Sequence, residues 1–169
     1  MTEEWLEIPE FPTYLVSSEG RVFNQVLGVY MSVSYTNHGH GKVTLRLENG
    51  IRRTRSVALL VASAFCDRPT ILFDAVIVLD GNLSDLRASN LAWRPSWFAW
   101  KYKRQQVEPQ PIHYHNLAVV NTITGEIYDS IAQAAKAEGL LHEDIWRSTY
   151  RGVAVFPTGS IFEVCEEGV

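Results

Sequence analysis

The sequence is poor in cysteine and contains no long apolar run. Its two cysteines, Cys66 and Cys165, stand 99 positions apart and form no CxxC pair, which argues against a zinc ribbon and a disulfide framework. No stretch approaches the roughly 18 apolar residues that span a bilayer, and the opening MTEEWLEIPE is acidic where a secretory signal is basic and then apolar. We therefore expect a protein of the reducing cytoplasm with no membrane partner.

Positive charge is also scarce, since 15 lysines and arginines face 19 acidic residues and give a net charge of −4. This balance argues at first against nucleic acid, because neutralisation of phosphates supplies most non-specific affinity for DNA. The distribution changes that interpretation: residues 46–104 carry ten basic and five acidic residues, and the flanking segments are acidic. One basic face is expected to bind phosphates, with a solvated face that has no ligand as the alternative.

Apolar material is sufficient for a core, at 46% hydrophobic and 11% aromatic residues in 169, which indicates a globular chain of one domain or a few small modules. Alternation, apolar runs and turn residues predict these elements in the first part of the chain: an extended module over 5–27, a hairpin over 42–57, a buried helix over 57–65, a strand over 75–79, a return strand over 90–93 and a helix over about 96–106.

The segment 107–115 holds two prolines and is the best linker candidate. After it, a hairpin over 117–128 is expected to lead into a helix that Ser130 caps and Gly139 ends. A second helix over 143–151 closes at Gly152. Two short helices joined by a glycine-containing turn suggest a helix-turn-helix.

Three blocks of this sequence together resemble HNH homing endonucleases, the kind common in phages. EEWLEIPEFPTYLVSSEGRVFN is similar to their N-terminal motif, and the block from Arg46 to Trp93 is similar to the HNH block, with its LVASAF helix, its Asp-Gly-Asn turn and Asn-Leu-Ala-Trp. The block from Asn116 to Gly152 is similar to their C-terminal DNA-binding module. The resemblance implies an α+β fold: a degenerate HNH (ββα-metal-like) core, followed by a small β-hairpin plus helix-turn-helix module. The expected domains are 1–106, the linker 107–115 and 116–169.

The chain departs from the family where the chemistry should be. The resemblance places a metal ligand at Ile77, the general base at Val78 and a further helix ligand near Ala99. Hydrolysis of a phosphodiester needs oxygen or nitrogen ligands for a hard divalent ion and a group that takes a proton from water, and aliphatic side chains supply neither. Asn90 remains, and the resemblance gives it the role of holding the loop through hydrogen bonds. We therefore expect neither a catalytic residue nor a cofactor.

The leading hypothesis is a sequence-specific binding protein for double-stranded DNA that has lost cleavage and acts in the bacterial cytoplasm as a repressor or other transcriptional regulator of a phage or mobile element. Backbone contacts are expected from the basic middle of the chain, and base contacts from the last helix. The candidate DNA-binding residues are Arg46, Arg52, Arg53, Arg55, Arg87, Lys101, Lys103, Arg104, Trp146, Arg147, Tyr150 and Arg151. Glu143 and Asp144 in the first turn of that helix would weaken its binding to phosphate.

Other hypotheses stay open. An active Mg²⁺-dependent nuclease would need a relocated metal site, for which the carboxylates of Asp80 and Asp85 are the candidates. The pairs His38/His40 and His113/His115 could hold zinc, although exposed histidine is the commoner explanation. A protein-binding inhibitor of a host factor is a third class, and both a monomer and a homodimer are compatible with the sequence. The tryptophans Trp93, Trp97 and Trp100 stand at helical spacing, which favours a place in the core over base stacking.

Overall fold

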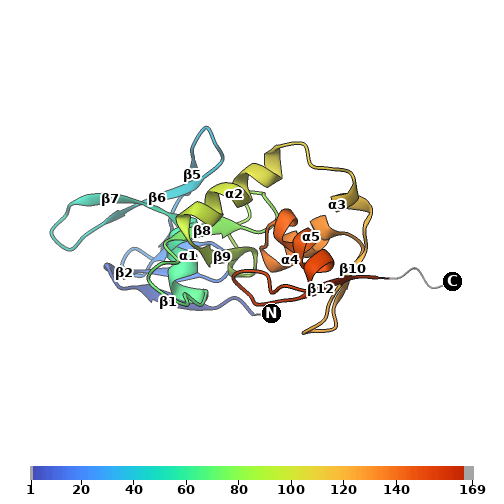
Figure 1. The fold of residues 1–169 in the computed structure, drawn as a ribbon. Helices are drawn as coiled ribbons and strands as arrows, with labels where there is room; N and C mark the ends of the chain where they lie inside the picture. Colours follow the sequence, from blue (N-terminus) through green and yellow to red (C-terminus); the bar gives the residue numbers. More distant parts are fainter. Residues whose placement is uncertain (1, 166–169) are drawn as a thin grey trace. The chain divides into compact units, whose positions relative to one another are not determined.

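A computed structural model describes residues 2–165, which form two compact units divided between Pro95 and Ser96. Within these residues the fold is a mixture of small antiparallel sheets and short helices (Figure 1). None of the described helices has the length and hydropathy of a membrane span.

The first unit begins with a four-stranded antiparallel sheet in the order β1-β2-β3-β4. Its strands are β1 (Trp5–Ile8), β2 (Phe11–Ser17), β3 (Val22–Asn24) and β4 (Val29–Tyr30). Gly20, in the turn between β2 and β3, has a positive φ of 83°, and a Cβ there would lie 2.8 Å from the Cβ of Leu86. This turn therefore depends on glycine both for its backbone conformation and for its close approach to the loop at Leu86.

A second sheet of the first unit has the order β5-β6-β7, with strands β5 (Ser34–Tyr35), β6 (Gly41–Arg46) and β7 (Arg52–Ser56). Strands β6 and β7 form a hairpin that projects from the rest of this unit, with its turn at the far end (Figure 1). The prediction of a hairpin here is confirmed. Its turn contains the pair Asn49-Gly50, and Gly50 has a φ of 83°, a left-handed conformation that glycine adopts without steric cost.

Helix α1 (Val57–Phe65) follows β7 directly and covers the core of the first unit. Ser56 caps it, because the Ser56 Oγ accepts a hydrogen bond from the backbone N–H of Leu59. Val57, Val61 and Ala62 are completely buried, whereas Leu59 is 41% exposed. The bounds of this helix and its burial against the core are as predicted, although one face, at Leu59, remains in solvent.

The last hairpin of the first unit consists of β8 (Ala75–Val78) and β9 (Leu91–Arg94), joined by a long loop that ends in the short helix η1 (Ala88–Asn90). Trp93 on β9 is buried and its Nε1–H donates to the carbonyl of Ala62 (3.1 Å), which fixes this strand to α1. The predicted strand and return strand are confirmed.

The second unit contains a three-stranded sheet of order β11-β10-β12 and four helices. Its elements in chain order are α2 (Ser96–Val107), α3 (His113–Asn116), β10 (Val119–Asn121), β11 (Ile127–Tyr128), α4 (Ile131–Glu138), α5 (His142–Arg151) and β12 (Phe162–Val164). Ser130 caps α4 and accepts from the N–H of Gln133, and Gly139 ends it with a φ of 64°. The predicted capping residues are confirmed.

The expected domain boundary at 107–115 differs from the structure, because α2 belongs to the second unit. Tyr102 on α2 is buried and donates to the carbonyl of Ala135 (3.4 Å). Gln105 bonds to the carbonyl of Leu140 (2.9 Å) and to the N–H of His142 (3.1 Å). These bonds fix α2 to α4 and α5. The segment 107–115 therefore lies within a unit, not between two.

The tryptophan row is also corrected. Trp93 is buried, but Trp97 and Trp100 are 55% and 59% exposed. Trp93 lies on β9, and the helix starts only at Ser96, so helical spacing does not continue across the junction. Within α2 the buried positions are Phe98 and Tyr102.

Candidate nucleic-acid interface

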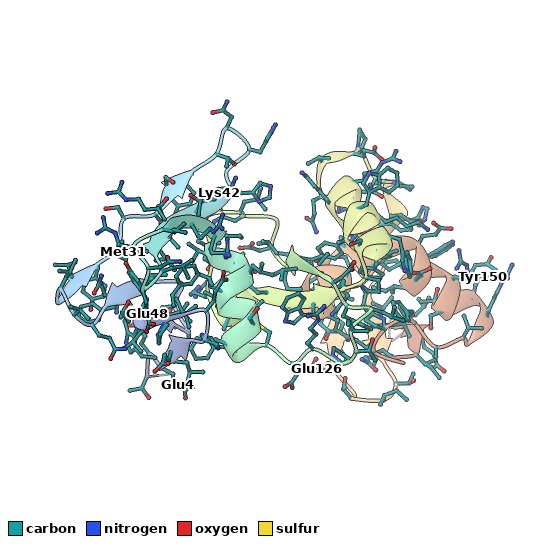
Figure 2. The ribbon with its side chains drawn as sticks, turned by 90° about the vertical axis from the view of Figure 1, so that its left-hand side faces the viewer. Glu4, Met31, Lys42, Glu48, Glu126 and Tyr150 are labelled. Atoms are coloured by element: carbon teal, nitrogen blue, oxygen red, sulfur yellow. The ribbon has the colours of Figure 1, made fainter. Side chains whose placement is uncertain are left out.

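The exposed face of the β6–β7 hairpin carries basic side chains that form no ion pair with any described residue. Side chains in β6 alternate: Val43 and Leu45 point into the core, and Lys42, Thr44 and Arg46 are exposed. Opposite them in the antiparallel register lie Ser56, Thr54 and Arg52, respectively. We call this set of six residues the ribbon face; Figure 2 labels Lys42 on it.

Arg46 and Arg52 are directly opposite each other at the end of the ribbon face next to the hairpin turn. No carboxylate pairs with either guanidinium among the residues that the structure describes. Like charges in such a cross-strand pair lie within about 5 Å of each other at their Cβ atoms and destabilise the strand pairing. Between them and Lys42, the hydroxyls of Thr44 and Thr54 meet at 3.0 Å. The ribbon face therefore offers cations and hydroxyl groups suited to an anion that the chain itself does not supply.

Arg55, a further candidate on β7, is engaged within the protein. Its guanidinium forms two hydrogen bonds with the carboxylate of Glu10, one of them at 3.0 Å, and stacks 5.5 Å from the ring centre of Phe11. The hydrogen bond from Arg55 lowers the pKa of Glu10 below its ordinary value. Arg53 is exposed on the same strand and has no ion-pair partner in the described part of the chain.

Arg87 is engaged in the same way. It holds both carboxylate oxygens of Asp85, at 2.8 and 2.5 Å, and this hydrogen-bonded pair raises the pKa of Arg87 and lowers that of Asp85. Arg55 and Arg87 are thus less available to phosphate than Arg46 and Arg52, since a phosphate would have to displace a carboxylate from each.

The loop between β8 and β9 is held by Asn90. The buried side chain of Asn90 donates to the Oδ1 of Asp80 (2.8 Å) and to the carbonyl of Asp85 (3.0 Å), and its Oδ1 accepts from the N–H of Asp80 (3.1 Å). The Oδ1 of Asp80 also accepts from the N–H of Asn82 (2.8 Å). The carboxylates of Asp80 and Asp85 therefore shape this loop: that of Asp80 holds the Asp80-Gly81-Asn82 turn, and that of Asp85 holds Arg87.

The positions at which the resemblance places metal chemistry do not fit a divalent ion. Ile77 and Val78 lie on β8, with Ile77 in the buried interior, and Ala99 lies on α2 in the second unit. None of these side chains has an oxygen or nitrogen atom to offer. Among the described residues no group of three or more histidine, cysteine or acidic side chains is arranged to hold a metal.

In the second unit, the basic end of α2 carries Lys101, Lys103 and Arg104, all exposed. Arg104 stacks 4.6 Å from the ring centre of Trp100 and pairs with Glu108 (2.7 Å). Lys101 lies 5.8 Å from the ring centre of Trp97. Lys103 has no ion-pair partner within residues 2–165.

Helix α5 follows α4 after a short turn and presents a mixed surface. Ile145 and Ser148 are buried, whereas Tyr150 is 79% exposed and Arg151 is exposed at the last turn. Arg147 is held on its own helix by Glu143 (2.7 Å) and Asp144 (3.1 Å).

Trp146, also on α5, is half-buried against the imidazole of His113, with ring centres 4.6 Å apart. It therefore has a packing role. Of the four histidines in the two His-x-His pairs, His113 alone is partly buried, and the other three are exposed. The imidazole of His113 contacts two aromatic rings, those of Tyr114 and Trp146.

No protein family and no curated protein matches the sequence. One solved structure matches: the chain is similar to the HNH homing endonuclease I-HmuI, whose structure comes from a study of DNA binding and cleavage by that enzyme. The TM-score is 0.57 and the sequence identity is 21%, and the match covers 98% of this chain and 99% of the I-HmuI chain. The chain has the fold of an HNH homing endonuclease. The likeness extends over both units, in accord with the three sequence blocks that resemble this family.

The ribbon face brings together Arg46 and Arg52 from the sequence-based candidates and adds Lys42, which the sequence analysis missed. The signal was present: Lys42, Thr44 and Arg46 alternate with Val43 and Leu45, so they share one face of the strand. The other candidates lie elsewhere on the first unit or in the second unit, and four of the arginines are paired with carboxylates: Arg55, Arg87, Arg104 and Arg147.

Proposed function

We propose that this protein binds double-stranded DNA at specific sequences without cleaving it, and regulates transcription in a phage or related mobile element, in the manner of a repressor. The observation that carries the proposal is the ribbon face. A two-stranded antiparallel ribbon fits the major groove of B-form DNA, and here it presents Arg46 and Arg52 side by side with no carboxylate partner in the described chain.

The fold supports the choice of DNA as the ligand, because its structural neighbour I-HmuI is a DNA-binding enzyme. The two hydroxyls of Thr44 and Thr54 add donors and acceptors for base edges or phosphates between the cations. In the second unit, α4 and α5 would act as a helix-turn-helix in which Tyr150 and Arg151 face the DNA, with Arg147 restrained by its own acidic neighbours.

Loss of cleavage follows from the residues at the expected centre. Ile77, Val78 and Ala99 cannot coordinate Mg²⁺ or take a proton from water. A relocated site at Asp80 and Asp85 is disfavoured, because hydrogen bonds within the loop engage the Oδ1 of Asp80 and Arg87 engages both carboxylate oxygens of Asp85. Binding without chemistry is sufficient to occupy a promoter.

The test measures binding and cleavage together. Purified protein is mixed with fragments of phage and bacterial genomic DNA at physiological salt with competitor DNA, with and without Mg²⁺, and retained fragments are sequenced and sized. We expect a few discrete fragments to be retained and uncut in both conditions. Cut fragments would overturn the loss of cleavage, and retention of no fragment would overturn DNA binding. The Arg46→Gln/Arg52→Gln variant is the control for retention through the ribbon face.

A further inference from the structure

The turn between β3 and β4 displays two adjacent aliphatic side chains to solvent. Val26 is 75% exposed and Leu27 is 70% exposed. Single exposed apolar residues are common on protein surfaces, but a neighbouring pair at the tip of a turn leaves a continuous apolar surface in water. We call these two residues the apolar tip.

The turn that carries the apolar tip is built by Asn24. The buried Asn24 side chain accepts hydrogen bonds from the backbone N–H groups of both Val26 and Leu27, each at 3.0 Å. The backbone carbonyl of Asn24 accepts a hydrogen bond from the N–H of Gly28 (2.9 Å), and Gly28 closes the turn with a φ of 66°. The backbone of the tip is therefore already ordered, so that binding through it has little conformational entropy to lose.

The apolar tip lies beside the basic end of the ribbon face. Val26 and Leu27 line a groove of about 560 Å³ in the first unit, and Arg46 and Arg52 line the same groove. Tyr14 and Leu45 also contribute to its lining, and Glu48 is the single acidic residue there. Cations that attract phosphate and an apolar surface that contacts sugars or bases thus share one concave site.

We propose that the apolar tip is a wedge that inserts between base pairs of DNA held by Arg46 and Arg52, and so bends the duplex at the ribbon face. This inference rests on the proposed DNA binding. Apolar side chains that enter a base step unstack it and kink the duplex, and the additional protein contacts offset the cost of unstacking. The cations fix the phosphate backbone next to the step, and the rigid turn holds the two side chains in the position of entry.

Ring closure measures such a bend on a short duplex cut from one of the genomic fragments that the protein retains. A DNA fragment of about 100 base pairs is shorter than the persistence length of about 150 base pairs, so ligase closes it slowly unless a protein bends it. The probe is this linear fragment with cohesive ends, and the readout is the yield of circles. Fluorescence anisotropy on the same fragment gives the affinity separately.

The test variant is Val26→Ser/Leu27→Ser, which removes the apolar surface and leaves Asn24 and Gly28 in place. Ile71→Ser/Leu72→Ser is the matched control, since Ile71 and Leu72 are also adjacent, are 83% and 72% exposed, and do not line the groove. We expect the wild type and the control to raise the yield of circles about tenfold, and the tip variant to lose this gain while its affinity changes less than about threefold.

Equal yields of circles from the tip variant and the wild type would overturn the wedge, as would a wild type that binds the fragment and forms no additional circles. A wild type that shows no binding in the anisotropy assay would overturn the proposed DNA binding, and the wedge with it. The affinity measurement therefore separates the two failures.

Discussion

Replacement of Arg46 and Arg52 by glutamine should move stability and DNA affinity in opposite directions. The two guanidinium groups repel each other across the β6–β7 register and have no carboxylate partner in the described residues. Removal of one charge relieves this repulsion in the free protein. In the complex, the same removal takes away a cation that we expect to contact a phosphate.

The magnitudes follow from the register and from counterion release. A like-charge cross-strand pair destabilises a hairpin by about 0.2–1 kcal/mol, so the free energy of unfolding of either single variant should rise by roughly that amount. Each phosphate contact contributes about 0.9 to the slope of log affinity against log salt, which at about 0.1 M salt corresponds to roughly eightfold in affinity. The double variant should therefore lose about 1.8 of slope and about sixtyfold in affinity.

Two assays measure these effects: urea unfolding for stability, and fluorescence anisotropy with a genomic DNA fragment over a series of salt concentrations. Arg55→Gln is the matched control on the same strand. Because Arg55 is held by Glu10 and stacks on Phe11, its loss should lower stability by up to about 1 kcal/mol and change the salt slope little. A double variant with an unchanged salt slope would refute the assignment of Arg46 and Arg52 to phosphate.

Two further predictions concern the folded state of each unit. Burial, together with the nearby His115, lowers the pKa of His142 to about 4 in the folded chain, whereas the imidazole of the unfolded chain keeps its ordinary pKa of about 6.5. Below pH 6.5 the unfolded chain therefore takes up a proton that the folded chain does not, and the free energy of unfolding should fall by about 2 kcal/mol between pH 7 and pH 5. Urea unfolding over this pH range measures the loss, which His142→Gln should lack; equal pH profiles of the two proteins would contradict this account. Asn90→Ala removes three hydrogen bonds of the Asn90 side chain, so the free energy of unfolding should fall by about 2–3 kcal/mol. The control Asn82→Ala removes one exposed hydrogen bond, which the Asn82 Oδ1 accepts, and should cost less than about 1 kcal/mol. Equal losses in urea unfolding would show that Asn90 does not hold the loop.

Local signals in the sequence predicted the helices of the second unit well. Ser130 and Gly139 mark the ends of α4, and Gly152 ends α5, because capping and left-handed closure depend on residues within one turn of the helix end. The domain boundary failed for the opposite reason. Two prolines near 110 looked like a linker, but the bonds of Tyr102 and Gln105 reach residues more than 30 positions away, and no local pattern indicates them.

The candidate site was predictable in part, and the limit again follows sequence distance. Pairing of Arg104 with Glu108 and of Arg147 with Glu143 is visible in the sequence, since each pair stands four residues apart on a helix. Pairing of Arg55 with Glu10 joins residues 45 positions apart and needs the fold. Charge counted along the chain therefore overestimates the number of free cations in its basic middle segment.

The ribbon face depends on the register of one hairpin, which explains why its geometry is specific. The turn from Leu47 to Ile51 sets Arg46 opposite Arg52, and the buried pair Val43 and Leu45 fixes which side of β6 meets the core. A shift of one residue would turn every side chain of the strand to the other face and bring Arg46 towards the interior. The same apolar alternation that forms the core thus holds two arginines together on the outside, and the repulsion between them is tolerated because burial of Val43 and Leu45 stabilises the hairpin by more than the about 1 kcal/mol that the like-charge pair costs.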